Sequence, residues 1–188
     1  MSREQLGERL GGLADKLSSE QLLKNQGIGN EIGFYIFAYD AAFEPLVSGY
    51  LPRLKEQLKT RGLTALEFDL YQLILDILKE RSLLEKSFVL EAQKGSEGLF
   101  EALKKIIRAE KVLEHITQRL SNPHDLVFIT GVGAAYPLIR SHTVLNNLHG
   151  VVEKTPLVMF FPGSYDGQTL ELFGELKDDN YYRAFPLL

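Results

Sequence analysis

Short apolar segments alternate with longer helical segments along this chain, and the alternation limits the fold to one class. Four segments have the length and composition of buried strands: residues 34–39, 63–68, 126–130 and 157–161. The stretches between them carry leucine and isoleucine at the spacing of an amphipathic helix. Apolar strands separated by helices are typical of parallel sheets that are covered on both faces. We therefore expect an α/β fold with a largely parallel central sheet flanked by helices.

Capping residues mark where several of the expected helices begin. Ser2 and Gln5 form a capping box at the first helix, Asp69 can cap the third, and Ser82 with Glu85 forms a second capping box. Proline and glycine mark several of the helix ends. The expected helices cover roughly residues 2–20, 45–62, 70–78, 82–93, 99–120 and 134–148.

Two regions depart from a simple alternation of strands and helices. About fifty residues of helix separate the second and third strands, whereas a crossover needs about a dozen, so we expect a helical insertion there, interrupted at residues 94–98. Near the C-terminus, Pro162 and Gly163 are expected to stop the fourth strand. Residues 169–176 and 181–187 then predict a C-terminal hairpin joined across residues 177–180.

The length and composition are those of an ordinary globular protein. A chain of 188 residues, 45% apolar and 24% charged, suits one domain over residues 1–188. It contains no cysteine, which excludes disulfides and thiolate zinc sites. The N-terminus lacks the apolar segment of a secretory signal, and no apolar run reaches the roughly 20 residues of a membrane span. We expect a cytoplasmic protein without membrane contact.

The charge distribution gives little support to nucleic-acid binding. A net charge of −4 opposes phosphate binding by the whole surface. The helix expected over residues 99–120 has a basic side that includes Lys104 and Arg108, but Glu101 and Glu110 are interleaved with them. A solvated helix face is the simplest interpretation, and we do not expect direct DNA binding.

The residues that follow the expected strands are candidates for a ligand site, because parallel sheets usually bind ligands beyond the carboxyl ends of their strands. Asp40, Asp69, Gly131 and Gly133 occupy such positions. The glycines follow a strand as in a dinucleotide loop, although Tyr136 replaces the last glycine of that pattern. They predict either a nucleotide or phosphate site or close strand-to-helix packing. The two aspartates either hold magnesium together, if their strands are neighbours, or cap helices.

Motifs of the common enzyme classes are missing from the sequence. No segment matches the Walker loop of nucleoside triphosphatases, and Ser164 lacks the flanking glycines of a hydrolase nucleophile elbow. The four histidines are not spaced to place two metal ligands on one helical face. We therefore name no catalytic, cofactor-binding or metal-binding residue, and expect a protein that is not an enzyme and carries no cofactor.

Several segments of the sequence resemble one protein family. They are residues 34–40, 130–137, 155–168, 172–174 and 180–185. The most specific are Phe-Pro-Gly-Ser-Tyr-Asp-Gly at 161–167 and Asn-Tyr-Tyr-Arg-Ala-Phe at 180–185. They resemble the BrxB family, an accessory component of bacteriophage exclusion (BREX) systems, at matching order along nearly the whole chain. The resemblance implies a defence cluster that also encodes an AAA+ ATPase, a DNA methyltransferase and a phosphatase-like PglZ protein.

The resemblance implies a role in phage defence but transfers no catalytic residue. It implies a non-catalytic accessory or adaptor protein that binds other BREX subunits, namely the PglZ-like protein, the AAA+ ATPase or the methyltransferase. The residues themselves leave open an alternative, a nucleotide- or phosphate-binding enzyme that uses the Gly131–Gly133 loop and the strand-end carboxylates. They also leave self-association open.

Tyr165, Asp166 and Arg183 lie in the segments that carry the resemblance and form a candidate functional cluster. Asp166 and Gly167 are a turn signal after the fourth strand. Where that turn meets the expected hairpin, Arg183 can pair with Asp166 through two parallel hydrogen bonds. The alternative is that the aromatic residues at 181, 182 and 185 edge the core.

Overall fold

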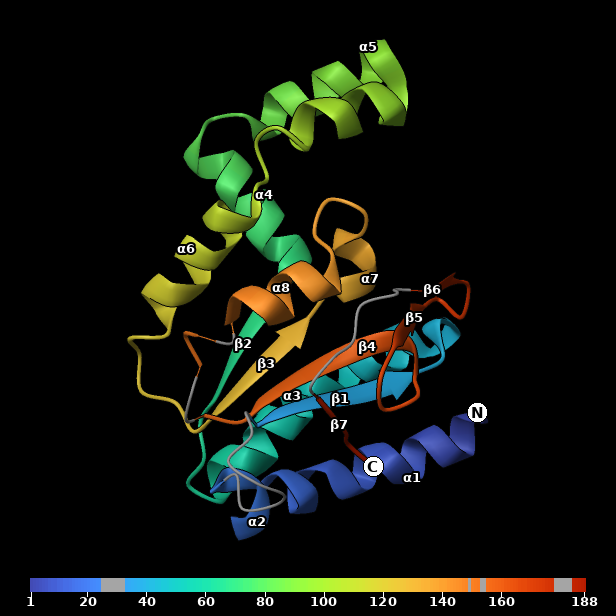
Figure 1. Cartoon of the computed structure of the whole chain (residues 1–188), viewed down its shortest axis with the longest axis vertical. Helices are drawn as coiled ribbons and strands as arrows, with labels where there is room; N and C mark the ends of the chain where they lie inside the picture. The colour runs from blue at the N-terminus through green and yellow to red at the C-terminus, as the bar shows by residue number, and fades with distance from the viewer. Residues whose placement is uncertain (25–32, 149, 153–154, 178–183) are drawn as a thin grey trace.

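Five parallel strands form the centre of the described part of the molecule (Figure 1). The computed structural model describes residues 1–24, 33–148, 150–152, 155–177 and 184–188. The strands lie in the order β2-β3-β4-β1-β7, and each pair along this path is parallel. Their bounds are Phe34–Tyr39 for β1, Ala65–Asp69 for β2, Leu126–Thr130 for β3, Leu157–Tyr165 for β4 and Phe185–Pro186 for β7. The predicted parallel α/β sheet is confirmed.

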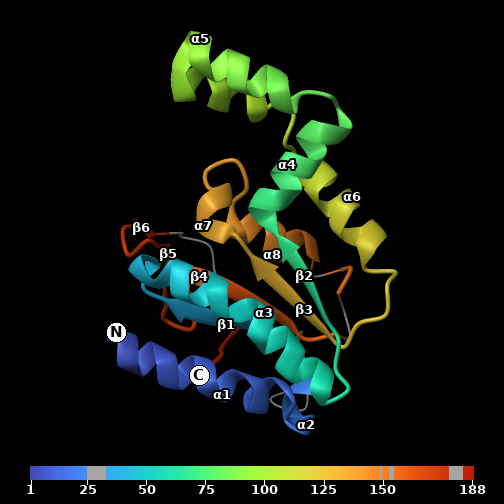
Figure 2. The same ribbon diagram turned by 180° about the vertical axis from the view of Figure 1, so that it is seen from behind.

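Helices cover both faces of this sheet (Figures 1 and 2). One layer contains α1 (Arg3–Leu17), α2 (Glu20–Leu23), the 3-10 turn η1 (Ala41–Phe43) and α3 (Glu44–Thr60). The other contains α4 (Leu70–Glu80), α6 (Ala109–Arg119), α7 (Val132–Ala135) and α8 (Ser141–Leu148), and α5 (Leu84–Leu103) connects α4 to α6.

The alternation of side chains along the strands divides the core between the two layers. Phe128 and Phe160 pack with α1 and α3, whereas Ile129 and Phe161 pack with the helices of the other layer. The rings of Phe128 and Phe160 lie 5.3 Å apart in an edge-to-face arrangement, which aromatic pairs favour. Each fully buried side chain of this size stabilises the fold by about 1.5–3 kcal/mol, so both layers are held mainly by apolar burial.

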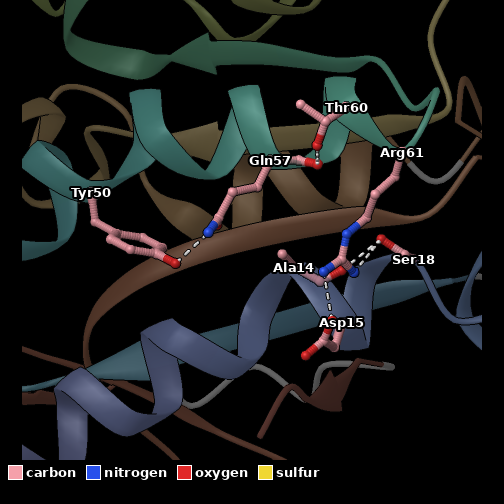
Figure 3. Close-up of polar contacts among 7 residues, drawn as sticks. All are labelled: Ala14, Asp15, Ser18, Tyr50, Gln57, Thr60 and Arg61. Atoms are coloured by element: carbon pink, nitrogen blue, oxygen red, sulfur yellow. Dashed lines mark hydrogen bonds and ion pairs between the residues drawn. The ribbon is translucent and has the colours of Figure 1, made fainter.

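The N-terminal helix is held to the first layer by its apolar stripe and by polar contacts at its end. The capping box of Ser2 and Gln5 is present, as predicted. At the other end, Arg61 bridges from the end of α3 to Asp15 at 2.6 Å and to Ser18 at 3.2 Å (Figure 3). These contacts fix the last turn of α1 against α3.

The insertion between β2 and β3 forms an arm made of α4, α5 and α6. In both views α5 stands away from the sheet, at the opposite end of the molecule from α1 (Figures 1 and 2). Gly95 interrupts α5 with a left-handed φ of 68°, which confirms the predicted break at residues 94–98. The predicted helix over 99–120 is instead divided between the end of α5 and α6, because residues 104–106 form turns and Arg108 is extended.

Two other helix predictions are also corrected. Ser82 does not cap α5, since it has a φ of 55° and the helix begins at Leu84 without a side-chain cap. The predicted helix over 134–148 is divided into α7 and α8. Tyr136, which precedes Pro137, is extended as the proline requires.

The C-terminal region differs most from expectation. Pro162 and Gly163 do not stop β4, which continues to Tyr165 and pairs antiparallel with β5 (Leu170–Leu172). A second antiparallel pair joins β5 to β6 (Leu176–Lys177). The predicted partner segment, residues 181–187, lies partly outside the described residues, and its described strand β7 instead pairs with β1 in parallel. None of the helices described is long and apolar enough to cross a membrane.

Candidate functional site

Asp69 and Gly131 are brought together at the carboxyl ends of the neighbouring strands β2 and β3. The Asp69 carboxylate caps α4 by accepting hydrogen bonds from the backbone of Tyr71 at 2.9 Å and Gln72 at 3.0 Å. Gly131 has a left-handed φ of 66°. A Cβ atom there would overlap the Asp69 carboxylate oxygen and lie 2.9 Å from its Cγ. Glycine is therefore needed at 131 both for its conformation and for space.

The position of the Asp69 carboxylate argues against phosphate binding at the Gly131–Gly133 loop. A phosphate that approached the amides after Gly131 would meet this second negative group, and like charges disfavour one another at such separations. The helix that follows, α7, spans only Val132–Ala135 and offers a weak dipole. The close-packing interpretation of the two glycines is the one that the geometry favours.

Asp40 and Asp69 do not lie close enough to share a metal ion. Their strands, β1 and β2, are separated by β3 and β4. At a strand spacing of about 4.8 Å the two strand ends are about 14 Å apart, so the condition for the magnesium hypothesis is not met. Asp40 instead caps η1 by accepting a hydrogen bond from Ala42 at 2.9 Å. Within the described ranges, no group of three or more His, Asp or Glu side chains could hold a metal ion.

Gly133 lies beneath Phe173, at the end of the sheet where α/β proteins usually bind ligands. After β1 the chain continues on one face of the sheet, and after β3 it continues on the other face, with β4 between these two strands. Ligands of α/β proteins usually bind where the connections diverge in this way. Here β4 continues past its neighbours, and Phe173 packs edge-to-face on Tyr136 with ring centres 6.3 Å apart. A Cβ at Gly133 would lie 2.9 Å from the Phe173 ring. Side chains occupy the space next to this glycine.

Asp166 and Tyr165 stabilise the turn that follows β4. The Asp166 carboxylate accepts hydrogen bonds from the backbone of Thr169 at 2.7 Å and of Gln168 at 2.8 Å, and from the Thr169 hydroxyl at 2.9 Å. These bonds lower the pKa of Asp166. Tyr165 donates a hydrogen bond to the Ala184 carbonyl at 2.8 Å, which ties the turn to the C-terminal segment. Arg183 lies outside the described residues, so its pairing with Asp166 stays a prediction.

The structure also shows two surfaces that the sequence reasoning missed. One is a pair of exposed apolar side chains, Phe88 and Val89, on α5. The other is a groove of about 480 Å³ between the arm and the 137–148 segment. For Phe88 and Val89, the only signal in the sequence is that they lie outside the apolar stripe of their helix. The groove depends on tertiary packing, which no local sequence pattern reveals.

Comparison with known proteins decides the family. The sequence profile described as "BREX protein BrxB" matches residues 66–187, which extend from β2 to β7. The chain belongs to the BrxB family. A BREX protein BrxB from Bacillus cereus (strain H3081.97) is 49% identical over 97% of both chains. A BREX protein BrxB from Escherichia coli O9:H4 (strain HS) is 36% identical over 96% of this chain and 90% of its own. No solved structure matches.

Membership of the BrxB family confirms the resemblance and implies a role in phage defence. The residues matched by the family profile include the arm, the Gly131–Gly133 loop and the turn at Asp166. The relatives also align with the region before residue 66, since each alignment covers nearly the whole chain. The whole α/β unit, with its arm, is therefore shared with other BrxB proteins.

Proposed function

We propose that this BrxB-family protein is a non-catalytic adaptor of a BREX system and binds other BREX subunits through its helical arm. Its partners are the PglZ-like protein, the AAA+ ATPase or the DNA methyltransferase. The observation that supports the proposal is the exposure of Phe88 and Val89, which are 57% and 56% accessible on α5, away from the sheet. Neither side chain belongs to the apolar core of the fold.

A partner can bury Phe88 and Val89 without disturbing the packing of the fold. α5 stands away from the sheet, so a second protein can reach it without displacing another element (Figures 1 and 2). Full burial of an apolar side chain of this size contributes about 1.5–3 kcal/mol. Two neighbouring anchors of this kind form the centre of a typical protein contact, in which a few apolar residues supply most of the binding energy.

The strand-end residues support the non-catalytic part of the proposal. Asp40 and Asp69 both use their carboxylates to cap helical turns, and the Asp69 carboxylate lies against Gly131. These groups serve the fold, and the alternative nucleotide- or phosphate-binding enzyme depends on the same groups. We further propose that the protein acts in the cytoplasm, a reducing compartment that suits a chain without cysteine.

Co-purification tests the adaptor proposal. A tagged chain is expressed together with a complete BREX cluster, and the recovered BREX subunits are quantified by mass spectrometry. We expect recovery of at least one subunit, and about a tenfold or greater loss with Phe88→Ala combined with Val89→Ala. Leu176→Ala, at another exposed apolar side chain, is the matched control and leaves recovery unchanged.

Each outcome of the co-purification is informative. Recovery of no BREX subunit by the wild-type chain contradicts the adaptor role. Recovery that the double variant does not reduce contradicts the assignment to the arm. Circular dichroism of each variant verifies that the fold is retained, which we expect because the substituted side chains are exposed.

A further inference from the structure

The groove between the arm and α8 is apolar inside and has room for a few large side chains. One wall comes from α5, α6 and the link between them and includes Ile107 and Val112; the other comes from residues 137–148 and includes Val144. The groove has a volume of about 480 Å³. A cavity of about 150 Å³ accepts a benzene-sized group, so this groove accommodates about three of them. That number fits the anchors that an amphipathic helix presents over two turns.

The charged residues that line the groove are all positive. Lys104 lies on the arm wall and Arg140 on the opposite wall, and no aspartate or glutamate is among the described lining residues. The Lys104 ammonium lies 5.7 Å from the centre of the Phe100 ring, which itself lines the groove. Its ion pair with Glu101 is long, at 3.9 Å, and largely exposed. The Arg140 side chain makes no hydrogen bond or ion pair with any residue that the structure describes.

From this arrangement we infer that the groove binds an acidic amphipathic helix of another BREX subunit. Apolar side chains of that helix enter the groove, and carboxylates on its two flanks meet Lys104 and Arg140 on the two walls. Helix-in-groove recognition of this kind uses apolar anchors at helical spacing, and complementary charges select the partner. The inference rests on the proposed adaptor function and adds a second contact, distinct from Phe88 and Val89.

Site-specific photo-crosslinking tests the inference in cells that express the complete BREX cluster. The photoreactive residue benzoylphenylalanine replaces Thr143, which lines the groove and is partly exposed. The control places it at Ser48, which is exposed on α3 in the other layer. We expect Thr143 to crosslink to a BREX subunit, within a segment that has apolar residues at helical spacing and flanking aspartate or glutamate. Ser48 does not crosslink to that segment.

Charge reversal gives the second measurement. Lys104→Glu combined with Arg140→Glu is expected to lower the Thr143 crosslink about tenfold or more, because like charges then face each other across the contact. Lys104→Gln with Arg140→Gln lowers it less. Arg53→Glu with Lys59→Glu reverses the same number of exposed charges on α3 and leaves the crosslink unchanged. Reversal of the acidic residues in the crosslinked segment restores the crosslink to the charge-reversed groove.

The outcomes separate this inference from the adaptor proposal. If BREX subunits co-purify but the groove gives no crosslink, the groove inference fails and the adaptor proposal stands. If no BREX subunit co-purifies, the adaptor proposal itself fails. A crosslink to a second copy of this chain, to a small molecule, or to a segment without acidic residues overturns the proposed occupant. So does a crosslink that charge reversal leaves unchanged.

Discussion

The substitution Gly131→Ala tests whether this glycine is needed for close packing or for ligand binding. Alanine at this position must keep a left-handed φ of 66° and also place a Cβ atom against the Asp69 carboxylate. The affected carboxylate is the N-terminal cap of α4. We therefore expect two separate losses of stability, one from the backbone and one from the displaced cap.

The expected magnitude follows from these two losses. A left-handed conformation costs an L-residue about 1–2 kcal/mol. Loss of a side-chain cap costs about 0.5–2 kcal/mol. Gly131→Ala should thus lower the free energy of unfolding by about 1.5–4 kcal/mol. For a domain of this size, that loss lowers the melting temperature by about 3–16 °C.

Gly62→Ala is the matched control for the backbone contribution. Gly62 also has a left-handed φ, of 78°, but a Cβ atom there would meet nothing within 4 Å. Alanine at 62 should therefore cost only the backbone part, about 1–2 kcal/mol. Guanidinium unfolding followed by far-ultraviolet circular dichroism measures both variants. The difference between them reports the clash with Asp69.

Two results would refute this reasoning. The first is an equal loss of stability in Gly131→Ala and Gly62→Ala. The second is strict additivity of Gly131→Ala with Asp69→Ala, because removal of the carboxylate should relieve the clash and make the double variant more stable than the sum predicts. Calorimetry with ATP and magnesium tests the ligand hypothesis separately, and binding that Gly131→Ala abolishes would favour it.

Three further substitutions test other parts of the structure. Tyr39 donates a hydrogen bond to Glu44 at 2.5 Å. Burial of the Tyr39 hydroxyl, and to a smaller extent the Glu44 carboxylate, raises the pKa of Tyr39 above its ordinary value of 10. Tyr39→Phe should cost about 1–2 kcal/mol at neutral pH. Because the unfolded chain loses this proton above pH 10, wild-type stability should fall there more steeply than that of the variant, and parallel pH profiles would contradict this. Arg61→Ala removes the largely exposed pair with Asp15 that joins α1 to α3 and should cost less than about 1 kcal/mol in urea unfolding, so a larger loss would contradict this small contribution. Gly163→Ala forces a Cβ atom onto the facing carbonyl of β5 and should cost about 2–3 kcal/mol, whereas an unchanged melting temperature would refute the close approach of the two strands.

The strands that could be predicted are those whose local pattern agrees with their environment. Residues 34–39 and 126–130 are short apolar runs with turn residues beside them, and they form β1 and β3 with the predicted bounds. The capping role of Asp69, one of the two alternatives for this residue, was also readable, because it stands directly before a helical stripe. In these places local chemistry and tertiary packing favour the same structure.

The predictions that were wrong depend on contacts with distant residues. Pro162 is a strand breaker by local rules, but it lies opposite Tyr39 at the end of β1, where the ladder between β1 and β4 ends. Gly163 then lets β5 approach closely enough to pair. Likewise, no local signal shows that residues 185–186 lie beside β1. The condition for the magnesium hypothesis, that β1 and β2 are neighbours, is not met for the same reason, because no single segment of the sequence determines the strand order.

The pairing of β1 with β4 and β7 also determines when the sheet can form during synthesis. Phe34 pairs with Leu157, and Tyr35 pairs with Phe185, so β1 lies between two strands that leave the ribosome late. The first strand therefore has to wait while most of the chain is made. The helices α4, α5 and α6 follow one another in the chain and can begin to form much earlier, although α4 and α6 also pack against the later helices α7 and α8. Phe88 and Val89 on α5 can thus be in place before the sheet closes, whereas the groove is completed only when α8 has been made.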